Sequence, residues 1–357
     1  MPGVNITTAV RQGPSAPASV ETSQMFAVGL AESGPSGEAT LVTSLAEFEA
    51  VYGGYVSYAY LHPTIQTFFE EGGTRAYISR VVGPEPTTGS ITLAEGGVGG
   101  EDVITITANG AGAWSSNVTV QVTAGTAAGT FIILIRKNGN LVYSTGNCSS
   151  VTQAVGRINS STAASAIVTA EDLQATGSPQ PEVSAATALS AGDDDRSAIV
   201  VADYVTALNN FLDSYGTGVV VCPESSHTTI QTGLATHANT YSRLAYLFGA
   251  FDDTIAETKT AGFNLSAADA NSEHVAYFYP WVYIPTSTNG INRLIPPVGY
   301  AAAKRALAHI QTGAHQPGAG LISAARFVNG VATDIDKTNG DALDDAYVNA
   351  IRIINNT

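Results

Sequence analysis

Short, continuous apolar segments alternate with helical segments along most of this chain, and that alternation limits the folds open to it. Strands of this kind are predicted at 26–30, 219–222, 244–251 and 274–285, and a helix is predicted at 229–241. Continuous apolar runs of this length are typical of strands buried on both faces of a sheet. Repeated strand–helix–strand units therefore predict a largely parallel sheet with helices on its faces.

Helix boundaries in the first part of the chain carry local signals. Ser44 followed by Glu47 is the capping-box pattern of a helix start. Pro63 is tolerated in the first turn of the next helix. The glycine pair that begins at Gly72 ends this helix, because glycine adopts the left-handed conformation of a C-cap. A strand over 74–82 follows, so this region is a helix-to-strand return in the α/β layer.

A different pattern occupies residues 84–179. Short β-rich segments separated by glycine-containing turns follow one another there, as at 103–107, 118–122 and 131–136. The predicted fold class is therefore α/β (α+β overall), with a mixed, largely parallel sheet core, flanking helices and an inserted β-rich domain of sandwich or barrel type. The expected divisions are an extended N-terminal arm at 1–23, the first part of the core at 24–83, the inserted domain at 84–179 and the second part of the core at 180–357.

Composition and charge narrow the functional classes. The 357 residues include 15 Lys and Arg against 30 Asp and Glu, and this net charge of −15 disfavours direct binding to nucleic acid. Charged residues make up only 13% of the chain, so we expect a surface of small uncharged side chains suited to packing against copies of itself. The first residues lack the regions of a secretory signal, and no apolar run is long enough to span a membrane. Cys148 and Cys222 lie far apart and indicate neither a zinc site nor a disulfide framework.

The N-terminal segment carries a strand pattern that has no sheet of its own. Val4, Ile6, Thr8 and Val10 recur at the period of two that gives a strand one apolar face. The rest of the segment, to about Ser23, is rich in Pro, Ser, Ala and Thr. We predict that this arm adds as a strand to the sheet of another subunit, where backbone hydrogen bonds supply affinity.

Two groups of residues permit an enzymatic or metal-binding interpretation. Cys222 and Asp252 follow apolar strands, where open α/β sheets place ligand sites, and His227 is near Cys222 in sequence. An α/β hydrolase using Cys222 or Asp252 is therefore the alternative function. Buried cysteines are, however, common packing residues, and aspartates after strands often cap helices.

Three consecutive aspartates at 193–195 could hold a calcium ion, although acidic residues before a helix are also favoured by its dipole. An extracellular β-rich adhesin is a third functional class, and it would need an export signal that the first residues do not show. We predict no catalytic residue, no metal site and no cofactor.

The order of motifs resembles the tail sheath proteins of contractile bacteriophage tails and of related phage-tail-like injection systems. The segment 68–82 is similar to a sheath pattern of two aromatic residues, two glycines and an arginine–valine strand. Gly110–Asn117 resembles the glycine-alanine-tryptophan turn of the family's inserted domain, and Met1–Val4 resembles the start of its N-terminal arm. Further similar segments are Leu41–Ser44 with Phe48, Tyr52–Gly54, Tyr279–Trp281 and Ile295–Pro297.

The resemblance implies a structural protein. Sheath subunits surround an inner tail tube in stacked hexameric rings and contract to drive the tube through a target envelope. The implied partners are other sheath subunits, the inner tube protein, the baseplate and the tail terminator, with no direct nucleic acid and no membrane. The implied location is the virion tail, assembled in the cytoplasm of a bacterial host.

Two further expectations concern residues of the core. Arg75 and Arg80 are candidates for charge contacts with carboxylates of a neighbouring subunit, and solvated ends of their strand are the alternative. The segment 341–352 is similar to the family's lead into a further C-terminal region, which we expect to be absent from this chain.

Overall fold

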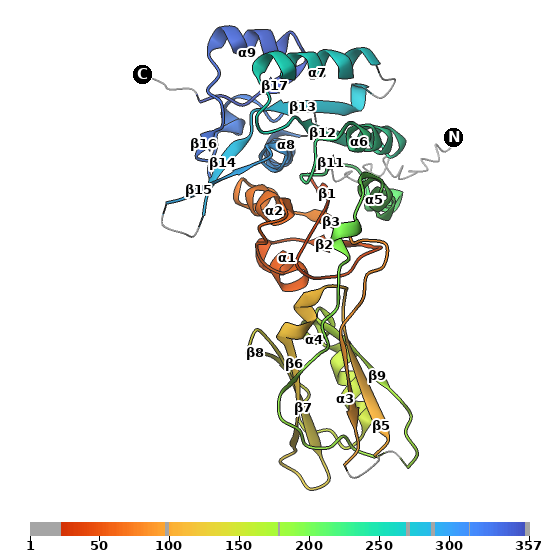
Figure 1. Cartoon of the computed structure of the whole chain (residues 1–357). Coiled ribbons are helices and arrows are strands. Elements are labelled where there is room, and N and C mark those ends of the chain that lie inside the picture. The colour runs from red at the N-terminus through yellow and green to blue at the C-terminus, as the bar shows by residue number, and fades with distance from the viewer. Residues whose placement is uncertain are drawn as a thin grey trace, which may run out of the picture.

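A computed structural model of the chain describes two parts, an α/β core and a β-rich module that extends from one end of it (Figure 1). The predicted arm residues Val4, Ile6, Thr8 and Val10 lie outside the described residues. The structure describes residues 23–96, 100–177, 179–268, 272–286, 290–313 and 315–353.

A seven-stranded sheet forms the centre of the core, and six of its strands are parallel. The strand order is β17-β13-β12-β11-β1-β3-β2, and only β2 runs antiparallel to its neighbour, β3. The fold class predicted from the alternating apolar segments is therefore confirmed. The strands are β1 (Met25–Gly29), β2 (Ala39–Val42), β3 (Ala76–Arg80), β11 (Val219–Val221), β12 (Leu244–Phe248), β13 (Val275–Tyr279) and β17 (Val348–Ala350).

Helices cover both faces of this sheet because successive strand residues point to opposite sides. Met25 and Ala27 of β1 belong to one hydrophobic cluster, and Phe26 and Val28 belong to the other. The first cluster is covered by α1 (Leu45–Tyr52), α2 (Leu61–Glu70) and α8 (Val298–Thr312). The second is covered by α5 (Val201–Ala207), α6 (Thr228–Thr240), α7 (Ile255–Ala268) and α9 (Lys337–Asp344).

The local helix signals act as predicted. The hydroxyl of Ser44 accepts the N–H of Glu47 at 3.2 Å, and the Glu47 carboxylate accepts the N–H of Thr43 at 2.8 Å. Pro63 lies in the first turn of α2. Gly72 ends that helix with φ +107°, a backbone conformation that favours glycine.

The module contains two antiparallel sheets that share one hydrophobic core with α3 (Val151–Ser160). The sheet orders are β10-β6-β7-β8 and β4-β5-β9, and α4 (Thr162–Ser165) follows α3. The inserted β-rich domain is therefore present. Its strands are β4 (Ser90–Ala94), β5 (Asp102–Ala108), β6 (Val118–Ala124), β7 (Phe131–Lys137), β8 (Asn140–Ser144), β9 (Val168–Asp172) and β10 (Thr187–Ala188).

Residues 180–193 pair with the module, although the sequence division placed them in the core. Thr187 of β10 pairs with Val120, and Thr87 pairs with Asp193 across an isolated bridge. The segment carries few apolar residues in a row, so its pairing with distant strands was not visible in its own pattern. The chain returns to the core only after Asp193.

The predicted strand at 274–285 is two strands in two different sheets. Pro280 has no N–H for a sheet ladder and separates β13 from β14 (Val282–Pro285). β14 lies between β15 (Asn292–Ile295) and β16 (Gly330–Val331) in a small antiparallel sheet with its own apolar cluster.

Candidate functional site

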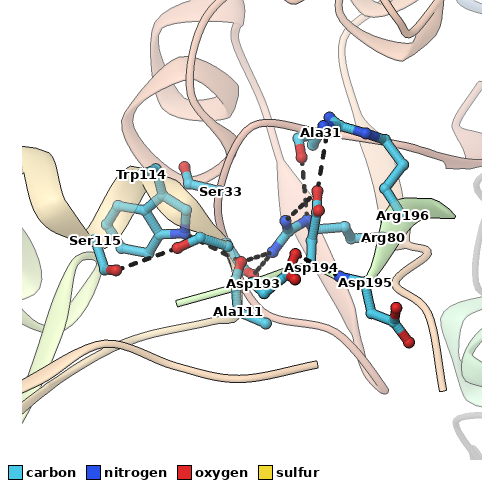
Figure 2. Close-up of polar contacts among 12 residues, drawn as sticks. Ala31, Ser33, Arg80, Ala111, Trp114, Ser115, Asp193, Asp194, Asp195 and Arg196 are labelled. Carbon is cyan, nitrogen blue, oxygen red and sulfur yellow. Dashed lines mark hydrogen bonds and ion pairs between the residues drawn. The ribbon is translucent and has the colours of Figure 1, made fainter. Parts of the chain in front are cut away.

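The contact between core and module is built around the guanidinium of Arg80 at the end of β3. Arg80 is 2% exposed. Its Nε donates to the carbonyl of Ala31 at 3.2 Å, and its Nη1 donates to the carbonyls of Gly34 and Ala111, each at 2.8 Å (Figure 2). One side chain therefore connects the loop after β1 to the module. We call this contact the joint; it comprises Arg80, the loop 30–34, Gly110–Ser115 and Asp193–Asp195.

Asp194 supplies the counter-charge in the joint. Its Oδ2 lies 3.8 Å from Arg80 Nη2 and 3.8 Å from Arg196 Nη1 (Figure 2). Burial lowers the pKa of Arg80, and the nearby Asp194 opposes that shift. A partly compensated cation thus sits between the two parts of the molecule, where water is largely excluded.

The other two aspartates of the run organise the backbone of the joint. Thr87 and Asp193 exchange N–H···O bonds of 2.8 and 3.0 Å, and the N–H of Gly83 donates to the carbonyl of Asp194 at 2.9 Å. The Asp195 carboxylate accepts the N–H of Glu85 at 3.1 Å. The triplet therefore ties together the two chain segments that cross between core and module. Neither helix capping nor calcium binding is needed to explain it.

The glycine-alanine-tryptophan segment forms the module side of the joint. Gly110 has φ +121°, and a Cβ atom built on it would lie 2.0 Å from the carbonyl oxygen of Gly34. The Trp114 indole N–H donates to the carbonyl of Ala111 at 3.2 Å. Ser115 Oγ donates to the carbonyl of Ser190 and accepts the N–H of Gly192, each at 2.8 Å. Backbone packs directly against backbone here, so the attachment is close.

The two arginines predicted to contact other subunits have different environments. Arg80 is buried and donates to carbonyls of its own chain. It is therefore not exposed for the predicted contact with another subunit. Its strand looked solvated from sequence because the carbonyls it binds come from distant loops. Arg75 is half-buried just before β3, and its contact with another subunit stays a prediction.

The residues of the hydrolase alternative are not arranged as a nucleophile with its base. Cys222 is 2% exposed, and burial raises the pKa of its thiol. His227 caps α6, with its Nδ1 accepting the N–H of Thr229 at 3.2 Å. Asp252 lies exposed in the turn after β12. Thiol nucleophiles need a lowered pKa and access to solvent, and Cys222 has neither.

The carboxylate of Glu224 occupies the position where doubly wound sheets usually bind a ligand. The strand order reverses between β1 and β11, and ligands of such sheets bind at that point, beyond the carboxyl ends of the strands. There Glu224 Oε1 accepts the N–H groups of Leu30 at 3.2 Å and Leu61 at 3.0 Å, and its Oε2 accepts the N–H of Tyr60 at 2.9 Å. The start of α2, a natural anion site, is therefore filled by the chain's own carboxylate.

A buried ion pair that the sequence analysis did not single out joins the two halves of the core. Glu71, from the two-glutamate segment before Gly72, lies 2.6 Å from Lys304 Nζ, and both side chains are at most 1% exposed. The Glu71 carboxylate also accepts the backbone N–H groups of residues 326–328 at 2.7–3.1 Å. Burial alone would raise the pKa of Glu71, but the hydrogen bonds from Lys304 and the backbone outweigh it and lower that pKa. A glutamate just before a glycine pair gave no local sign of this role.

Among the residues that the structure describes, no group of three or more His, Cys, Asp or Glu side chains is placed to hold a metal ion. None of the helices among those residues is long and apolar enough to cross a membrane.

Known proteins match this chain through structure and not through sequence. No protein-family model and no curated protein matches it. A sheath tail protein from Listeria innocua superimposes with a TM-score of 0.61 at 12% identity, over 95% of this chain and 67% of that one. A sheath tail protein from Desulfitobacterium hafniense gives a TM-score of 0.56 at 15% identity, over 99% of this chain and 72% of that one. The chain therefore has the fold of sheath tail proteins, with both the α/β core and the inserted module included in the likeness.

Proposed function

We propose that this protein is the structural subunit of a contractile tail sheath, which surrounds an inner tube in stacked hexameric rings and contracts to drive that tube through a target envelope. The observation that carries the proposal is the fold: two sheath tail proteins superimpose on 95% and 99% of the chain. The motif order in the sequence supports the same function. So does a composition with only 13% charged residues, which favours packing against copies of the same chain.

The joint suits a subunit that moves without deforming. Contraction of a helical lattice requires subunits to rotate and slide while each one keeps its shape. Arg80 binds carbonyls of both core and module, and Gly110 packs on Gly34 with no room for a side chain. We infer that the module moves together with the core as one rigid unit.

Contacts between subunits are assigned to the arm. The proposed inserted face consists of Val4, Ile6, Thr8 and Val10, which would extend a sheet of the neighbouring subunit. The proposed partners are further copies of this chain, an inner tube protein, a baseplate and a tail terminator, in a virion tail assembled in the cytoplasm of a bacterial host.

We propose no enzymatic activity and no cofactor for this subunit. The buried Cys222 thiol and the helix-capping His227 argue against the hydrolase alternative. The internal carboxylate of Glu224 at the usual ligand position argues in the same direction. Assays of generic ester and phosphate turnover with Cys222→Ala and Asp252→Asn test this, because activity lost in either variant would favour an enzyme.

The proposal is tested by replacing one face of the arm. A variant with Val4→Asn, Ile6→Asn and Val10→Asn should keep the melting temperature of the core and should weaken self-association in sedimentation velocity. A matched control with Asn5→Ser, Thr7→Ser and Ala9→Ser, on the opposite face, should associate like the natural chain. Electron microscopy should show rings or tubes for the natural chain and for the control.

A natural chain that stays monomeric and forms no rings or tubes at any concentration reached would contradict the sheath function. A natural chain that assembles, with an arm variant that associates as well as the control, would keep the sheath function and overturn the arm assignment.

A further inference from the structure

Two arginines of the core stack on exposed tyrosines of the segment between α1 and α2. The guanidinium carbon of Arg196 lies 3.5 Å from the centre of the Tyr58 ring, and that of Arg293, on β15, lies 3.3 Å from the centre of the Tyr55 ring. Tyr55 is 44% exposed and Tyr58 is 40% exposed. We call these four residues the arginine–tyrosine patch.

The patch presents cations that have little carboxylate of their own. A guanidinium that stacks on a ring uses its flat face, which leaves the N–H groups at its edge to bind a carboxylate. Arg293 belongs to none of the ion pairs among the described residues. Arg196 lies 3.8 Å from Asp194, whose side chain is 17% exposed and equally close to Arg80. Because arginine and tyrosine are also enriched at the centres of protein interfaces, the patch fits an acidic protein surface.

An acidic surface of this kind lies on the same chain, around α9. Its basic groups are Lys337, which pairs with Asp341, and Arg352, which lies beside Gly340. The aspartates exposed on α9 and on its two flanks outnumber them: Asp334, Asp336, Asp341, Asp344 and Asp345. The last two of these belong to none of the ion pairs among the described residues.

Tyr347 adds an aromatic side chain to this surface. It is 68% exposed, more than any other large hydrophobic side chain of the described residues. Its φ is +61°, a conformation that bulky residues rarely adopt, and its N–H donates to the carbonyl of Asp344 at 2.9 Å. Backbone outliers of this kind are concentrated at functional positions. We call Asp344, Asp345 and Tyr347 the acidic ridge.

The patch and the ridge lie in different parts of the molecule. Figure 1 shows α9 at the end of the core farthest from the module, whereas α1 and α2, which flank the patch segment, lie nearer to the module. A contact between two unlike surfaces of identical chains repeats head to tail. Such a contact closes into a ring or continues as a helical filament, depending on the rotation between neighbours.

We propose that the arginine–tyrosine patch binds the acidic ridge of a second copy of this chain. The N–H groups of Arg196 and Arg293 donate to the ridge carboxylates, and Tyr347 packs beside the tyrosines of the patch. Opposite charges favour this orientation over patch against patch or ridge against ridge. The inference rests on the self-association that the proposed function requires, and it names a contact outside the arm.

Charge reversal tests the contact by sedimentation velocity of the full chain over a range of concentrations. The patch variant Arg196→Glu/Arg293→Glu and the ridge variant Asp344→Lys/Asp345→Lys should each weaken self-association at least about ten-fold, as loss of an interface hot spot does. An equal mixture of the two variants should restore the natural association. In that mixture a reversed patch meets a reversed ridge, and a natural patch meets a natural ridge.

Two control variants make the same changes of charge elsewhere. Lys259→Glu/Arg326→Glu lies outside the patch, and Glu101→Lys/Asp102→Lys lies in the module, outside the ridge. Both should associate like the natural chain. A mixture of the Lys259→Glu/Arg326→Glu variant with the ridge variant should not restore association, since it provides no reversed patch. Melting temperatures show which variants keep the fold.

Three results would overturn the proposal. They are a patch or ridge variant that associates as tightly as the natural chain, a mixture of these two that does not restore association, and a module control that is weakened as much as the ridge variant. Arg196 lies beside the joint, so Arg293→Glu alone is a second patch variant if the double one does not fold. Unchanged association of Arg293→Glu would then overturn the proposal.

The contact and the sheath function can fail separately. Rings or tubes formed by the folded patch variant as readily as by the natural chain would keep the sheath function and overturn the contact. A natural chain that associates through patch and ridge but forms no rings or tubes would keep the contact and overturn the sheath function.

Discussion

The core and the inserted module bury polar groups in very different ways. Every charged side chain that the described structure buries almost completely lies in the core: Glu71, Arg80, Arg243 and Lys304. The buried polar residues of the module are Ser115 and Thr145. Three of the five strand pairings in the module join consecutive strands, whereas the core strands come from both ends of the chain.

The difference shows what the buried charges are for. Each of the four bonds to backbone groups of irregular connections. Glu71 accepts from the N–H groups of 326–328, and Lys304 donates to the carbonyl of 324. Arg80 donates to the carbonyls of 31, 34 and 111, and Arg243 donates to those of 211, 212 and 216. Buried backbone groups outside a sheet or helix need partners. In this molecule the parallel core satisfies such groups with charged side chains, and the antiparallel module does so without them.

The largest expected effect comes from breaking the ion pair that joins the halves of the core. Lys304→Met leaves the Glu71 carboxylate buried without its cation and should lower the free energy of unfolding by about 3–5 kcal/mol. Lys337→Met, in the exposed pair with Asp341, should change it by less than about 0.5 kcal/mol. Tryptophan fluorescence separates the two parts of the molecule, because Trp281 lies in the core and Trp114 lies in the module. A loss of stability in Lys304→Met no larger than that in Lys337→Met would contradict the comparison.

The same pair predicts the direction of a pH effect. The pKa of Glu71 is lowered in the folded state, so its stabilising contribution is present above the ordinary carboxyl pKa and is lost as the pH falls through the lowered value. Chemical unfolding of the double variant Glu71→Gln/Lys304→Met should depend less on pH in the acid range than unfolding of the natural protein. If the free energy of unfolding of the double variant depends on acid pH as steeply as that of the natural protein, other carboxylates dominate the acid dependence of stability.

A smaller effect is expected at the joint. Arg80→Met removes the donor of three carbonyls and should cost about 2–4 kcal/mol. It should also separate the unfolding of module and core, which limited proteolysis near residues 83 and 196 would detect. Arg75→Met, at the other end of the same strand, is the matched control. If module and core still unfold together in Arg80→Met, the remaining contacts of the joint are sufficient to couple them.

A backbone contact at the joint is tested by two glycine substitutions. Gly110→Ala places a methyl group 2.0 Å from the Gly34 carbonyl at a φ of +121° and should cost about 1–3 kcal/mol. Gly139→Ala has a positive φ of +78° and no atom within 4 Å, so it measures the conformational cost alone. Equal losses in thermal unfolding would show that the contact with Gly34 contributes nothing.

The smallest effect is expected inside the module. The Thr145 hydroxyl accepts the N–H of Ile133 and donates to the carbonyl of Gly146, each at 3.0 Å. Thr145→Val should cost about 1 kcal/mol and should shift the Trp114 and Trp281 signals alike, because Arg80 couples the unfolding of module and core. Thr119→Val, half-buried on β6, serves as the control and should leave both signals in place.

Part of this structure was determined by short-range sequence patterns. The apolar segments at 219–222 and 244–251 predicted buried parallel strands, and the capping pair Ser44 and Glu47 and the glycine at 72 marked helix ends. These features depend on residues within one or two turns of each other, so the local sequence contains their whole physical cause.

The tertiary structure alone decided the roles of Arg80, Glu71 and Glu224 and the return of residues 180–193 to the module. Each depends on backbone groups that are distant in the sequence, such as Ala111 for Arg80 and Phe327 for Glu71. A lone charged residue on a strand or before a glycine looks solvated until its distant partners are known. The chain thus fixed its strands and helices locally, while the positions of its buried charges came from where folding brought unpaired backbone groups together.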